Sequence, residues 1–164
     1  MNNIVSNINK FINTIFIVFS LLFLAVLTGS IAVQVYTRYI LGASMTGTEE
    51  LARYSFIWLT MLGASICINE NAHATVTLLN DKLTGNLKRI HNLTCDAMVM
   101  IAVVVLFIYG LKMVFLTTNQ LTPSLQIPMA IVYLSLPVGA FGMIIGTFHN
   151  FLKHYKATAK GENE

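Results

Sequence analysis

The chain has 164 residues, of which 55% are hydrophobic and only 10% are charged, and its mean hydropathy is +0.70. Charged residues make up about a quarter of an ordinary soluble domain, so this composition excludes a soluble protein and predicts one that spans a membrane. The net charge of +3 comes from basic residues scattered at the ends of apolar stretches. They form no basic face, which excludes a nucleic-acid partner.

The first predicted span follows an amphipathic lead-in. Residues 1–13 place isoleucine and phenylalanine at spacings of three and four with asparagines between them, which is typical of a helix that lies in the membrane interface. No charged residue occurs between Lys10 and Arg38, and this run is long enough to cross the bilayer. We expect the first transmembrane helix at residues 14–36, and we expect that the amino-terminal segment is not cleaved.

The second span begins near a capping box formed by Thr46 and Glu49, and we place it at residues 49–69. Its uncharged part begins only after Arg53. The sixteen residues from there to the end of the span rise about 24 Å as a helix, less than a hydrocarbon core of about 30 Å. Arg53 or Glu70 is therefore expected near the headgroups or against a partner protein.

The spacing of apolar residues and the positions of helix-breaking residues predict the later elements. They are an interfacial connection at 74–91, a third transmembrane helix at 92–111, a fourth at 129–152 and a tail at 153–164. In the connection, apolar residues recur three or four positions apart and charged residues lie off this stripe, which is typical of a second interfacial helix. Pro128 ends a loop before the fourth span. Within that span, Pro137 and nearby glycines predict a kinked, closely packed helix.

The positions of lysine and arginine predict the orientation. With the amino terminus in the cytoplasm, seven basic residues lie inside, and only Arg38, Arg53 and Lys112 lie outside. The expected fold is therefore an all-α membrane protein with four transmembrane helices, amphipathic interfacial helices and both termini in the cytoplasm. The 164 residues leave no room for a separate soluble domain, so residues 1–164 form a single membrane domain.

No group of residues predicts catalysis. Cys95 lies four residues after His91, but no further ligand completes a metal site. The four histidines lie in connections or at the ends of spans, whereas a haem-binding pair needs inward-facing side chains on rigid helices. Asp96 falls in the first turns of the third span, where contact with the headgroup region is expected. We expect no catalytic, cofactor-binding or metal-binding residues, and no enzyme.

A polar cluster at the ends of the second span is the most informative feature. Glu49 and Glu50 lie four and three residues before Arg53, and Glu70 and His73 follow the span. One interpretation is a capped helix with an interfacial ion pair, which contributes a few tenths of a kcal/mol in water, on the order of an exposed pair. The other is that these groups bind another membrane subunit, or fix the second helix to the first through Arg38.

Three blocks of sequence carry a family resemblance. They are Arg38-Tyr39 with residues 49–54, Trp58-Leu59, Leu62-Gly63-Ala64, Glu70 and His73; then Leu125 to Met129, including Pro128; and then Tyr133 with Leu136-Pro137. In order and spacing they resemble the DctQ-type small membrane subunit, or Q subunit, of the tripartite ATP-independent periplasmic (TRAP) transporters. The sequence departs from the pattern at Gly47, where the family commonly carries tryptophan.

The resemblance implies a scaffold subunit in the bacterial inner membrane. Its implied partners are a large permease that moves the solute by an elevator-like motion driven by a sodium gradient, a periplasmic binding protein that delivers the solute, and membrane lipids. The solutes of the family are organic acids such as dicarboxylates, other carboxylates and sialic acids. The partner-binding or structural candidates are the residues singled out above, namely Arg38, Glu49, Glu50, Arg53, Trp58, Gly63, Glu70, His73, Pro128 and Pro137.

Three alternatives remain open at this point. A membrane anchor of a respiratory enzyme holds haem or quinone between its helices. A self-sufficient small transporter normally shows an ionisable residue near mid-membrane or paired discontinuous helices, and this sequence has no clear example of either. A stand-alone structural or stress protein needs neither feature.

Overall fold

Long apolar helices account for most of the residues that the structure describes. The computed structural model describes residues 2–42, 45–69 and 86–160. Its helices are α1 (Asn2–Tyr39), α2 (Thr46–Asn69), α4 (Asn86–Leu116), α5 (Met129–Tyr133) and α6 (Ser135–Lys160). Four stretches are long and apolar enough to cross a membrane: Phe11–Tyr39, Thr46–Asn69, Thr94–Leu116 and Met129–Phe151. The predicted all-α fold with four membrane-spanning helices is confirmed.

Several helix ends differ from the expected bounds. Helix α1 begins at Asn2, so the lead-in at 1–13 continues into the first span as one helix. Its asparagines do not stop the helix because no proline or glycine lies among them. Helix α4 likewise begins at Asn86, within the expected connection, whose earlier part lies outside the described residues. Helix α6 extends into the expected tail as far as Lys160.

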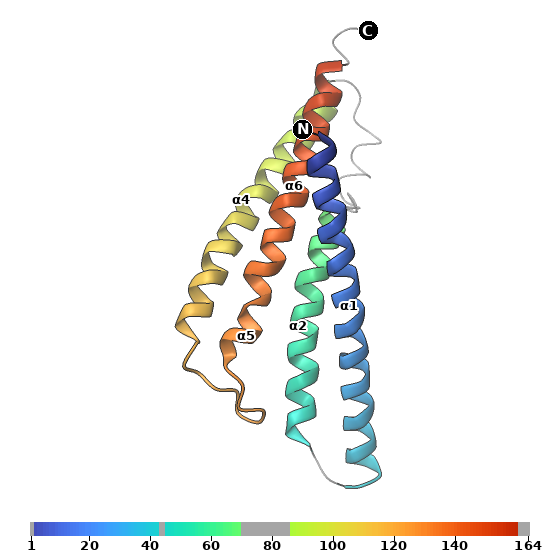
Figure 1. Ribbon diagram of the computed structural model, residues 1–164, viewed down its shortest axis with the longest axis vertical. Helices are drawn as coiled ribbons and strands as arrows, with labels where there is room; N and C mark the ends of the chain where they lie inside the picture. Colours follow the sequence, from blue (N-terminus) through green and yellow to red (C-terminus); the bar gives the residue numbers. More distant parts are fainter. Residues whose placement is uncertain (1, 43–44, 70–85, 161–164) are drawn as a thin grey trace.

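The helices are arranged around a central pair. Helices α2 and α6 lie side by side, α1 packs on α2, and α4 packs on α6 (Figure 1). Helix α1 starts, and α2 and α6 end, at one end of the molecule, which we call the terminal end. The segment joining α4 to α5 lies at the opposite end, which we call the hairpin end (Figure 1). Helices α1 and α4 therefore pack mainly on α2 and α6 respectively, and both expose wide apolar surfaces.

Helix α1 turns a mostly polar seam inward. The seam residues repeat every three or four positions and are buried or half-buried: Asn9, Asn13, Phe16, Ser20, Phe23, Leu27, Ser30, Gln34 and Thr37. A strict seven-residue repeat is the pattern of left-handed helix pairing. The Phe23 ring stacks on Trp58 of α2, with the ring centroids 5.4 Å apart. Small polar residues inside and large apolar residues outside are what a lipid solvent favours.

Glycines allow α6 to approach α2 closely. A Cβ added to Gly139 would lie 2.9 Å from the Met61 carbonyl oxygen, and one added to Gly142 would collide with Phe16 and Ser65. The predicted close packing of the fourth span is therefore present. The span is divided at Leu134 into α5 and α6. Pro137 explains the break, because it has no N–H for the carbonyl four residues earlier and its ring crowds that carbonyl.

Candidate functional site

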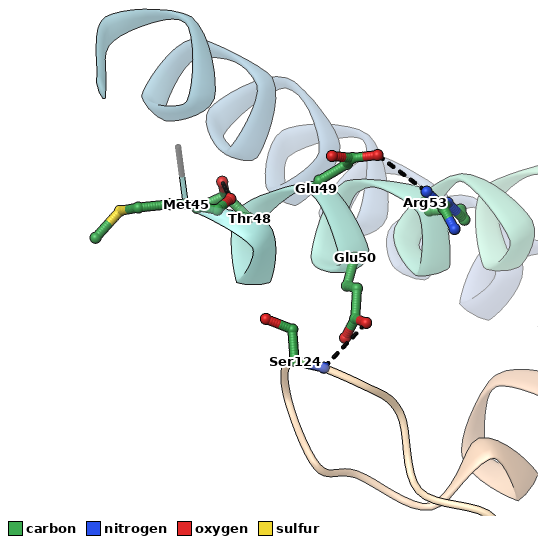
Figure 2. Close-up of polar contacts among 6 residues, drawn as sticks. All are labelled: Met45, Thr48, Glu49, Glu50, Arg53 and Ser124. Atoms are coloured by element: carbon green, nitrogen blue, oxygen red, sulfur yellow. Dashed lines mark hydrogen bonds and ion pairs between the residues drawn. The ribbon is translucent and has the colours of Figure 1, made fainter. Parts of the chain in front are cut away.

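The two adjacent glutamates at the start of α2 have different partners. Glu49 Oε1 accepts a hydrogen bond from Arg53 Nη2 at 3.0 Å, in an exposed ion pair whose side chains are 55% and 63% exposed. Glu50 is only 9% exposed, and its carboxylate points to the segment before α5 (Figure 2). Its two oxygens accept hydrogen bonds from the amides of Ser124 and Leu125, each at 3.1 Å. Successive residues of a helix point about 100° apart, which explains why the two neighbouring glutamates have different partners.

The segment that Glu50 binds is a compact hairpin, residues 120–129. The Thr122 amide donates to the Ile127 carbonyl at 2.9 Å, and the Met129 amide donates to the Gln120 carbonyl at 2.8 Å. The fully buried Thr122 hydroxyl accepts a further bond from the Ile127 amide at 3.2 Å. Gln126 takes the left-handed conformation, with φ of 53°, that lets the chain reverse. These bonds order the hairpin although it lies outside the helices.

The carboxylate of Glu50 fastens this hairpin to α2. Consecutive backbone amides at a turn form an anion-binding concavity, and hydrogen bonds to a charged acceptor are stronger than neutral ones. The Thr46 and Ser124 hydroxyls add a bond of 2.8 Å across the same junction. A hollow of about 320 Å³ remains beside the junction, lined by Thr46, Glu49, Glu50, Arg53, Pro123 and Ser124. The junction therefore presents charges from α2 next to a fixed segment of backbone.

This geometry separates the two interpretations of the polar cluster. Arg53 pairs with Glu49 as expected, but Glu50 binds the hairpin and not Arg53. The predicted capping box is replaced by other contacts, because Thr46 bonds to Ser124 while Glu49 bonds to Arg53. Arg38 is exposed, and in the described part of the chain no ion pair joins it to α2. The hypothesis that Arg38 fixes the first two helices together is therefore not supported.

The remaining candidate residues are dispersed. Trp58 joins α2 to α1 by its ring stack. Gly63 is half-buried, and a Cβ added there would meet nothing within 4 Å. Pro128 pairs with Leu121 in the hairpin and caps α5, whereas Pro137 lies in the first turn of α6. Glu70 and His73 lie outside the described residues.

A second junction, which the sequence did not indicate, fixes α2 at the terminal end. Asn150 of α6 donates from Nδ2 to the Ile68 carbonyl at 2.8 Å, and Asn69 donates to the Asn13 side chain at 3.4 Å. Carbonyls in the last turn of a helix lack partners within the helix, so the Asn150 amide satisfies one of them. The presence of asparagines within apolar spans was the feature of the sequence that could have predicted these hydrogen bonds. Helix α2 is thus held by hydrogen bonds to neighbouring segments at both ends.

Charged residues lie toward the ends of the spans. Arg53, the eighth residue of the Thr46–Asn69 stretch, is the deepest one on α2, and Asp96 is the third residue of Thr94–Leu116. Lys112 lies four residues before the end of that same stretch. Within the described residues, no group of three or more histidine, cysteine, aspartate or glutamate side chains gathers as a metal site. The described spans therefore place no charged side chain at mid-depth.

Four membrane-spanning helices with polar junctions at their ends define a multi-pass membrane protein. Residues 27–157 match the family described as "Tripartite ATP-independent periplasmic transporters, DctQ component". This match covers most of the chain, so the protein belongs to the DctQ family of TRAP transporter subunits, and the predicted resemblance is confirmed. It is a multi-pass protein of the inner membrane, and as a transporter subunit it is not an enzyme.

Individual relatives agree with this assignment. A putative TRAP transporter small permease protein of Haemophilus influenzae is 34% identical over 124 residues, which are 75% of this chain and 76% of the relative. The sialic acid TRAP transporter small permease protein SiaQ of Vibrio cholerae is 26% identical over 137 residues, or 84% and 79% of the two chains. The isethionate TRAP transporter permease protein DctMQ of Oleidesulfovibrio alaskensis is 33% identical over 104 residues, which are 62% of this chain but only 16% of that protein.

Proposed function

We propose that this chain is a scaffold that binds and steadies the large permease of a TRAP transporter. The observation that carries the proposal is that α2 is fastened to its neighbours at both ends, by Glu50 at the hairpin end and by Asn150 at the terminal end. Between these two ends, the glycines of α6 let it pack closely against α2. Such an arrangement resists relative sliding of the helices, which suits a fixed support and not a moving carrier.

The distribution of charge also supports a scaffold role for this chain, with the permease carrying the solute. A protein that carries an ionic solute normally has ionisable groups at mid-membrane, and such groups are costly there unless they are used. The charged residues of the described spans lie toward their ends, as set out above. We therefore assign solute binding, and the use of a sodium gradient, to the large permease. The present chain needs no cofactor in this scheme.

The solute class is proposed from the relatives. One relative is named for sialic acid and another for isethionate, so related subunits serve different solutes. We propose that the complete transporter imports an organic acid, a class that includes dicarboxylates, other carboxylates and sialic acids. The scaffold role does not depend on which of them is carried, because the selective site lies in the other subunits.

We further propose that the hairpin end lies in the periplasm and helps to receive the substrate-binding protein. The excess of lysine and arginine in the connections and tail at the other end favours this orientation. The hairpin is ordered by its own hydrogen bonds and exposes Leu121 and Leu125. A fixed, partly apolar surface costs less entropy to bind than a flexible loop.

Co-purification tests the proposed assembly. The chain is expressed with an affinity tag together with the large permease encoded beside it, and membranes are solubilised in a mild detergent. We expect the permease to be recovered with the tagged chain in equal molar amounts, and to unfold at a lower temperature when purified without it. Recovery of the tagged chain alone, with unchanged thermal stability of the permease, would contradict the proposal.

A further inference from the structure

One face of α2 is not covered by any other helix that the structure describes. Trp58 contacts α1, and Met61 and Ser65 lie against α6, so both neighbouring helices occupy one side of α2. On the other side, exposed residues recur at spacings of three or four, which keeps them on a single face. We call this surface the open face of α2, and it consists of Glu49, Arg53, Phe56, Thr60, Ala64 and Cys67.

The open face is poorly suited to lipid. Helix α2 is the least apolar of the four spans, and its open face carries an ion pair and the Thr60 hydroxyl. Gly63 lies at the edge of this face, and a Cβ added there would meet nothing. By contrast, much of the exposed surface of α1 is made by large side chains such as Val18, Leu21, Leu22 and Leu24. Lipid tails solvate large apolar residues, whereas small residues permit close approach of another helix.

At the hairpin end, the open face continues into the contact between α2 and the hairpin. The ion pair between Glu49 and Arg53 borders the hollow of about 320 Å³, whose other wall is formed by Pro123 and Ser124 of the hairpin. Glu50 holds that wall in place through two backbone amides. The open face therefore offers a polar contact of fixed shape at one end, the exposed Phe56 ring next to it, and the smaller side chains of Thr60, Ala64 and Cys67 beyond.

We propose that a transmembrane helix of the large permease packs along the open face of α2, with polar permease side chains meeting Glu49 and Arg53. This inference rests on the proposed function, since it requires that the chain bind such a permease. The isethionate relative favours this occupant: the present chain matches only 16% of that longer permease protein, so a similar segment is there covalently joined to the rest of a permease.

A matched pair of glycine substitutions tests the face. Gly63 borders the open face and Gly29 lies on the exposed side of α1, and neither has an atom within 4 Å of an added Cβ. Both G63L and G29L are therefore expected to leave the isolated chain folded. We expect G63L to reduce the permease recovered with the tagged chain by about tenfold or more, because a leucine there overpacks the interface, and G29L to leave recovery unchanged.

Labelling of Cys67 gives a second readout that needs no disruptive substitution. In a C95S background, Cys67 is the only cysteine, and it is exposed on the open face. We expect N-ethylmaleimide to modify Cys67 in the isolated chain and to modify it about tenfold more slowly in the purified complex, because the permease covers the thiol.

The outcomes separate this inference from the proposed function. If wild-type chain recovers the permease while G63L does so equally well and Cys67 is labelled at the same rate in the complex, the scaffold role stands and the open-face inference is overturned. Protection of Cys67 in a purified dimer of the chain alone would show that a second copy covers the face, which also overturns it. Failure of the wild-type chain to recover the permease overturns both.

Discussion

Replacing Glu50 with alanine is expected to release the hairpin from α2. The substitution removes the acceptors of the Ser124 and Leu125 amides at a residue that is 9% exposed. Hydrogen bonds to a charged group contribute about 1.5–3 kcal/mol each, but Ser124 and Leu125 are exposed and their released amides can bond to water. We therefore expect a local loss of about 2–3 kcal/mol, less than the sum of the two bonds, and roughly 30-fold to 150-fold faster amide exchange. Hydrogen–deuterium exchange of peptides covering residues 120–129 measures this directly. In the complete transporter, the same variant is expected to weaken binding of the periplasmic protein.

The adjacent glutamate provides the control. Glu49 belongs to an exposed ion pair, which contributes about 0.3–0.5 kcal/mol, so E49A is expected to change hairpin exchange less than about threefold. E50Q keeps the shape of the side chain but offers one acceptor oxygen in place of two, and we expect an intermediate effect. Equal exchange in E50A and E49A would show that Glu50 does not hold the hairpin.

Gly142→Ala is expected to have the largest effect on packing of the central helices. A Cβ at this position would meet the Phe16 ring and the Ser65 hydroxyl, so α1, α2 or α6 must shift. Overpacking of this kind costs about 1–3 kcal/mol, more than the gain of up to about 1 kcal/mol in helix propensity from glycine to alanine. We expect a lower unfolding temperature for the purified chain in detergent, followed by intrinsic fluorescence or loss of helical circular dichroism.

Gly29→Ala is the matched control for this prediction. A Cβ at Gly29 would meet nothing within 4 Å, so only the propensity gain applies and stability is expected to stay the same or rise slightly. If the two alanine variants unfold at the same temperature, close approach at Gly142 does not limit the packing of these helices.

The spans were predictable because their signal is local. The charge-free run between Lys10 and Arg38 identifies the first span, and Pro128 marks the start of the fourth, from the local sequence alone. The break at Leu134 also follows locally from Pro137. The helix ends were harder to predict, because polar asparagines at the start of α1 do not end a helix when no residue nearby prevents its continuation.

The junctions at the ends of α2 depend on contacts between distant residues. Glu49 and Glu50 both satisfy the spacing for a pair with Arg53, and only the folded structure shows that Glu50 turns to an amide 74 positions away. The Asn150 bond to the Ile68 carbonyl joins positions 82 residues apart. Sequence spacing identifies which residues are neighbours on one helix, but not which other segment packs against them. The polar cluster on α2 was therefore predictable from the sequence. The different roles of Glu49, which pairs with Arg53, and Glu50, which binds the hairpin, were not.

Solute uptake into proteoliposomes tests whether this chain supports a transporter and does not itself move the solute. Vesicles are prepared with the chain alone, or with the chain and the large permease, and are supplied with the loaded binding protein and a sodium gradient. We expect uptake only when the permease is present. Sodium-dependent accumulation of solute in vesicles that contain this chain alone would contradict this expectation.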